Sequence, residues 1–72
     1  MHKKIRNLTD FAGNAALYRL DDGSFVIASS VTSYSGAETL VFPADSDGNV
    51  TDWCEIGGGR GYLNHEEALA TL

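Results

Sequence analysis

The chain lacks the residues that usually stabilise a very small domain through covalent bonds or metals. Its 72 residues include a single cysteine, Cys54, and only two histidines. One cysteine cannot form an internal disulfide, and there is no Cys/His quartet for structural zinc. Folding at this size buries only about 60% of the surface that the unfolded chain exposes. We therefore expect stability to come from a tightly packed small core or from self-association.

Long apolar runs are also missing. No stretch approaches the ~20 apolar residues of a membrane span. The basic N-terminus is not followed by the apolar run of a signal peptide. A lone cysteine is typical of a reducing compartment. These features predict a cytoplasmic protein that does not contact membranes.

Basic residues are few and lie mainly at one end of the chain. Residues 1–20 hold four of the five, and the net charge is +3 over residues 1–20 and −8 over residues 21–72. A body this acidic repels phosphate backbones, so direct nucleic-acid binding is not expected. The same field attracts basic protein surfaces, although net charge also simply keeps small domains soluble.

The pattern of apolar residues and turns predicts an antiparallel β-meander over residues 15–56. A strand at 15–20 is followed by a turn at 21–24, a long strand at 25–34 and a turn at 35–37. A hairpin over 38–56 is the central element, with arms at 38–43 and 50–56 around a turn at 44–49. Short turns place consecutive strands antiparallel. Pro43 must end its arm or lie at an edge.

The two ends of the chain are expected to differ. Residues 1–14 predict either a short amphipathic helix or a disordered basic arm, and both alternatives stay open. Residues 57–63 predict a flexible glycine-rich loop. Residues 64–72 predict a helix, with Asn64 as its N-cap, Glu67 completing a capping box and Leu63 providing a hydrophobic staple. The predicted fold is one α+β domain over 1–72: a meander of three or four strands with a C-terminal helix on one face.

Three segments suggest ligand or catalytic chemistry, and each has a simpler explanation. The turn at 45–49 lacks the carboxylate spacing of an EF-hand. The glycines at 57–61 match neither the Walker pattern nor Gly-x-Gly-x-x-Gly. Cys54 and His65 are a nucleophile and a base by residue type, but a strand cysteine is usually a small buried hydrophobe, and His65 is expected to be exposed. We predict no catalytic residue, no cofactor and no metal.

Aromatic residues give the stronger functional signal. The chain holds one Trp and three Tyr, more than so small a core needs, and these side chains are enriched at binding hot spots. Trp53 is expected in the core, with an interface position as the alternative. The predicted partner-binding residues are Tyr34, Asp45, Asp47, Asp52, Arg60 and Tyr62.

Part of the chain resembles a known group of proteins. The specific part is Glu38-Thr39, Phe42-Pro43-Ala44-Asp45, Gly48 and Asp52-Trp53, followed by His65 near Ala68-Leu69. With these residues, positions 17–72 resemble small uncharacterised proteins of phages and prophages, best represented in actinobacterial phages. The chain departs from them in its basic N-terminal segment, its triple glycine and its end soon after Leu69. The resemblance implies a fold and a viral setting, and it assigns no activity.

The sequence therefore favours a non-catalytic protein-binding module, acting as a phage-encoded inhibitor or modulator of a host protein in the host cytoplasm. Its partner would present a basic surface. One alternative is a self-assembling structural or regulatory subunit, for which a homodimer is the simplest form. Another is a binder of a small ligand or metal that uses the glycine-rich loop or the aspartate turn.

Overall fold

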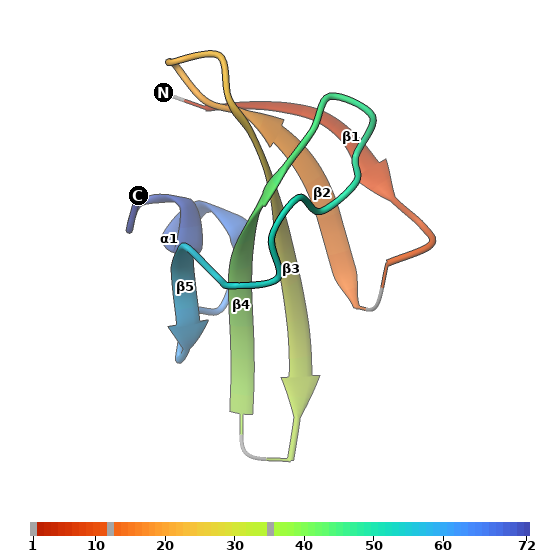
Figure 1. Cartoon of the computed structure of the whole chain (residues 1–72). Coiled ribbons are helices and arrows are strands. Elements are labelled where there is room, and N and C mark those ends of the chain that lie inside the picture. Colours follow the sequence, from red (N-terminus) through yellow and green to blue (C-terminus); the bar gives the residue numbers. More distant parts are fainter. Residues whose placement is uncertain (1, 12, 35) are drawn as a thin grey trace.

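The chain forms one five-stranded antiparallel sheet with a short helix on one face (Figure 1). This computed structural model describes residues 2–11, 13–34 and 36–72. The strands lie in the sheet in their order along the chain. The predicted α+β class is confirmed, but there are five strands rather than three or four. The elements are β1 (Lys3–Leu8), β2 (Asn14–Arg19), β3 (Phe25–Ser33), β4 (Gly36–Ala44), β5 (Gly57–Arg60) and α1 (His65–Leu69).

The N-terminal segment is a strand, which corrects both alternatives predicted for residues 1–14. β1 pairs antiparallel with β2 along its length, from Lys3 opposite Arg19 to Leu8 opposite Ala15. The register shifts between Lys4 and Arg6, which marks a bulge at the edge of the sheet. Charged side chains and a bulge are common protections of an exposed sheet edge. These features also hide the alternating pattern by which a strand is recognised.

The two central hairpins agree closely with the sequence. β2 and β3 pair from Arg19 opposite Phe25, and Gly23, with φ +88°, forms the turn between them. β3 and β4 pair along their whole lengths. The second turn is shorter than predicted, because Gly36 already belongs to β4. Ser35, which the prediction placed in this turn, lies outside the described residues.

The partner of β4 is the glycine-rich segment, not the predicted return arm. Val50 makes only an isolated bridge with Ala44, and residues 51–56 form no strand. β5 instead pairs with β4 from Gly57 opposite Val41 to Arg60 opposite Glu38. The segment predicted as a flexible loop is therefore an edge strand.

Close packing explains the first two glycines of this strand. Gly58 has φ +75°, a conformation that residues with a Cβ rarely adopt. A Cβ on Gly58 would collide with the carbonyl oxygen of Thr39 and would lie 3.1 Å from the Cβ of Ala68. A Cβ on Gly57 would lie 2.6 Å from the Thr71 hydroxyl. Only glycine lets β5 fit between β4 and the C-terminal segment.

The sheet is covered on both faces by small clusters of apolar side chains. The helix-face core joins α1 to the strands and consists of Ala16, Tyr18, Val26, Ala28, Val41, Ala68 and Leu69, with Leu20 and Tyr62 at its margin. The far-face core consists of Leu8, Ala15, Leu17 and Ile27, with Phe11, Phe25, Ala44 and Val50 at its margin. The loop that runs from β4 to β5 crosses the sheet in Figure 1 and brings Val50 to the far-face core.

The helix begins where the capping pattern predicts. The Asn64 side chain accepts a hydrogen bond of 2.9 Å from the Glu67 backbone N–H. The Glu67 carboxylate accepts in return from the N–H of Leu63, at 2.8 Å, rather than from that of Asn64. Leu63 is 65% exposed, so the predicted staple does not bury it. The helix ends at Leu69, three residues before the predicted end.

Candidate functional site

The most prominent surface feature is Trp53, which was expected in the core. Its side chain is 68% exposed. One face of the indole is nevertheless held, because it stacks on the Phe11 ring at 6.0 Å between centroids and 23° between planes. The Phe42 ring meets it edge-on at 5.5 Å and 64°. Trp53 thus covers the margin of the far-face core while presenting its remaining surface to solvent.

Two backbone hydrogen bonds fix the ends of the loop that carries Trp53. Thr51 N–H donates to the Pro43 carbonyl at 2.9 Å, and Ile56 N–H donates to the Val41 carbonyl at 2.8 Å. Because these acceptors are only two residues apart on β4, the four residues between Thr51 and Ile56 must leave the plane of the sheet. We call residues 51–56 the Trp53 loop. Asp52 stabilises it locally by accepting from the Cys54 N–H at 3.0 Å.

The turn at residues 45–49, which precedes the Trp53 loop, is held by hydrogen bonds of its own. The Asp45 carboxylate accepts from the backbone N–H groups of Asp47 and Asn49, each at 3.0 Å. These bonds, above all that from Asn49, lower the pKa of Asp45 from its usual value. Arg6 of β1 donates to the Asp47 carbonyl at 2.5 Å and so ties the turn to the opposite edge of the sheet. Asp45 therefore has a structural role in the turn.

Cys54 lies on the surface beside Trp53, which corrects its expected burial. The negative charge of Asp52 is the main cause that raises the pKa of the thiol, and a hydrogen bond with Asp52, slight desolvation and the charge of Glu55 act in the same direction. A raised pKa leaves less thiolate at neutral pH, which is the opposite of an activated nucleophile.

The predicted partner-binding residues fall into two groups at opposite ends of β4. Asp45 and Asp47 lie just beyond its C-terminal end, and Asp52 follows in the Trp53 loop. The second group lies toward its N-terminal end: Tyr34 in the β3–β4 connection, Arg60 opposite Glu38, and Tyr62 just after β5.

The second group is not one continuous aromatic surface. The Tyr34 side chain is fully exposed. Tyr62 is half-buried and packs against the helix-face core, and its carbonyl accepts from the Thr39 hydroxyl at 2.9 Å. Tyr62 is therefore partly a packing residue. Trp53, which was assigned to the core with an interface position as the alternative, is largely exposed.

A second polar cluster surrounds Tyr18, which the sequence suggested as a surplus aromatic but which is buried. Its hydroxyl lies 2.9 Å from Nδ1 of His65, and Nε2 of His65 lies 2.8 Å from the Asn14 carbonyl. A carbonyl only accepts, so Nε2 carries the proton and Nδ1 accepts from the tyrosine. His65 is consequently half-buried between two partners, not exposed as predicted.

The N-terminus joins this cluster through His2. Its ring meets Tyr18 edge-on at 5.4 Å, and Nε2 donates to Glu66 at 2.8 Å. Burial, with a smaller contribution from the charge of Glu66, raises the pKa of Tyr18. The hydrogen bonds of this cluster link His2 and β2 to α1. The cluster therefore fastens the helix to the sheet.

The segments suggested for ligands use their groups internally. The Gly58 N–H donates to the Thr71 hydroxyl at 2.9 Å, so it does not point into an anion cradle. Within residues 2–11, 13–34 and 36–72, no group of three or more His, Cys, Asp or Glu side chains is placed to hold a metal ion. In the same residues, no helix has the length and apolar character needed to cross a membrane.

Comparisons with protein-family models, with curated proteins and with solved structures find no match to this chain.

Proposed function

We propose that the chain is a non-catalytic protein-binding module whose main contact is the Trp53 loop. The supporting observation is that Trp53 is 68% exposed and yet held between Phe11 and Phe42. An exposed aromatic that is already ordered loses little conformational entropy when it binds. Tryptophan is also among the residues that contribute most at protein interfaces.

The charge around Trp53 indicates the kind of partner. Asp52 and Glu55 flank it in the loop, and Asp47 lies in the preceding turn. Ile56, which is half-exposed, extends the apolar contact area. An apolar centre within a rim of carboxylates complements a partner with an apolar pocket surrounded by Lys and Arg. Such a rim raises the association rate more than it raises the affinity.

The resemblance to phage and prophage proteins supports a further part of the proposal. In that setting the module inhibits or modulates a host protein, and it acts in the host cytoplasm. The partner would be a host protein with a basic surface around the site that Trp53 enters. The Tyr34 end of the molecule would remain free in this complex.

Capture from an extract of the source cell, followed by quantitative mass spectrometry, tests the proposal. Trp53→Ala should lose a protein that the unchanged chain captures, and Tyr34→Ala, which removes a still more exposed aromatic, should keep it. Asp47→Lys with Glu55→Lys should weaken capture, with an effect that grows at low salt. Asp45 is left unchanged because it holds the turn. Capture that is lost equally with Tyr34→Ala, or that does not depend on Trp53, would contradict the proposal.

A concentration series by sedimentation velocity separates this function from self-assembly. The proposal predicts a monomer at all concentrations in the absence of the partner. A dimer that Trp53→Ala dissolves would instead assign the same surface to contact between two copies of the chain.

A further inference from the structure

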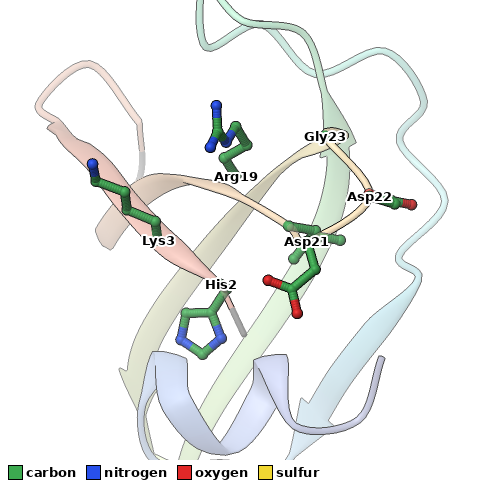
Figure 2. Close-up of a pocket in the computed structure, with 7 residues that line it drawn as sticks. His2, Lys3, Arg19, Asp21, Asp22 and Gly23 are labelled. Carbon is green, nitrogen blue, oxygen red and sulfur yellow. The ribbon is translucent and has the colours of Figure 1, made fainter.

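A cavity lies where the turn between β2 and β3 meets the start of β1. Its volume is about 500 Å³, within the usual range for small-molecule sites. Charged side chains form most of its wall (Figure 2). The lining residues are His2, Lys3, Arg19, Leu20, Asp21, Asp22 and Gly23.

Two cations lie next to each other in this wall. Lys3 and Arg19 are directly opposite in the β1–β2 register. Directly opposite residues project from the same face of a sheet, and like charges in this arrangement destabilise the pair. Neither residue forms an ion pair with a residue that the structure describes. Within the described residues, no ion pair therefore compensates these two charges, which lie beside an open cavity.

The acidic residues of the wall do not neutralise this pair. Figure 2 shows the Lys3 and Arg19 side chains extending away from His2, whereas the Asp21 carboxylate extends toward His2 and the Asp22 carboxylate points outward. Asp22 accepts from both the N–H and the hydroxyl of Ser24 and so belongs to the β2–β3 turn. The His2 ring is held by Glu66. One end of the cavity therefore remains positive in a chain whose net charge is −5.

Protection of the sheet edge explains only part of this arrangement. Lysines on an edge strand discourage pairing with another chain, which would account for Lys3 and Lys4 alike. Arg19 is on β2, an inner strand, where this protection is not needed. Its planar guanidinium donates two parallel hydrogen bonds to a carboxylate or phosphate.

We propose that Lys3 and Arg19 bind the oxyanion of a small ligand, a phosphate ester or a carboxylate, in this cavity. The site is separate from the Trp53 loop and does not depend on the partner proposed above. Arg19 supplies the directional contact, and Lys3 adds a second positive charge from the neighbouring strand. The remaining volume accommodates the uncharged part of the ligand.

Titrations of the isotope-labelled chain followed by NMR test this site, with inorganic phosphate, glycerol 3-phosphate and acetate as separate probes at constant ionic strength. At least one probe should give saturable shifts centred on Lys3, Arg19 and Gly23. Saturation by the phosphates alone assigns a phosphate ester, and saturation by acetate as well assigns a broader oxyanion site. Lys3→Gln and Arg19→Gln should each weaken binding at least about fivefold.

Lys4→Gln is the matched control, because Lys4 carries the same charge one position along β1, opposite Tyr18, and does not line the cavity. It should leave the affinity nearly unchanged. Lys3→Arg should retain binding, which separates loss of charge from loss of fold. Shifts that do not saturate with any probe, that spread over all basic residues, or that are weakened equally by Lys4→Gln would overturn the assignment.

Discussion

Gly58→Ala is expected to destabilise the protein strongly, because the added methyl group causes both backbone strain and a steric overlap. A non-glycine residue at φ +75° costs about 1 kcal/mol or more. The new Cβ also overlaps the Thr39 carbonyl oxygen and presses on Ala68. Inserting a methyl group into a filled space costs about 1–3 kcal/mol. Together these costs predict a loss of about 2–4 kcal/mol, a large share of the stability of about 4–11 kcal/mol expected for 72 residues.

Urea denaturation followed by far-ultraviolet circular dichroism measures this loss, and Gly23 provides the control. Gly23 has a similar φ, +88°, but a Cβ there meets nothing within 4 Å. Gly23→Ala therefore carries a comparable backbone cost without the collision. Gly58→Ala should be the less stable of the two by at least about 1 kcal/mol, or about 4–8 °C in Tm. Equal stabilities would refute the close packing of β5 between β4 and the helix.

Three further predictions follow from hydrogen bonds in the structure. Asn64→Ala should cost about 1 kcal/mol in the same urea assay, because it removes the N-cap of α1, and Asn64→Asp should restore most of it. Tyr18→Phe should cost about 1 kcal/mol by removing the hydrogen bond to His65. Because the pKa of Tyr18 is raised, the neutral hydroxyl stabilises the fold fully below pH 10, and this stabilisation is lost as pH rises through the folded-state pKa. Only the unchanged chain should therefore show this loss of stability at alkaline pH. Because the pKa of Asp45 is lowered, its carboxylate stabilises the fold at pH values above the ordinary aspartate pKa, and this stabilisation is lost as pH falls through the folded-state pKa. Asp45→Asn should therefore flatten the acid side of a plot of Tm against pH. An unchanged plot would contradict the turn geometry.

The elements that the sequence predicted well are those with strong local signals. β2 and β3 combine apolar and β-branched residues with an Asp-Gly turn between them. α1 begins at the capping residues that predict its start. In these segments the local preference and the tertiary structure agree. Boundaries were less accurate, since the helix ends at Leu69 although the pattern continues.

The two edge strands could not be predicted because their cause is not local. β1 is charged and bulged, so no alternation of apolar and polar residues marks it. β5 consists largely of glycine, which has low strand propensity. Its first two glycines fit because Ala68, Thr71 and the Thr39 carbonyl approach the backbone too closely for a Cβ. That contact depends on residues ten or more positions away.

Trp53 illustrates a similar difficulty at the candidate site. A large apolar residue within a strand-like segment is normally assigned to the core. The deciding fact is that Thr51 and Ile56 attach to acceptors only two residues apart on β4, which pushes the intervening residues off the sheet. No local pattern in residues 51–56 reveals this, whereas the acidic character of the loop was visible in the sequence.

Photo-crosslinking in the source cell tests the central claim most directly. A photoreactive amino acid in place of Glu55 lies beside Trp53 without removing it, and the same group in place of Tyr34 probes the opposite end of β4. The account predicts one major protein adduct from position 55, lost when Trp53→Ala is added and absent from position 34. An adduct from position 34 alone, or one from position 55 that survives Trp53→Ala, would contradict the claim that the Trp53 loop is the binding surface.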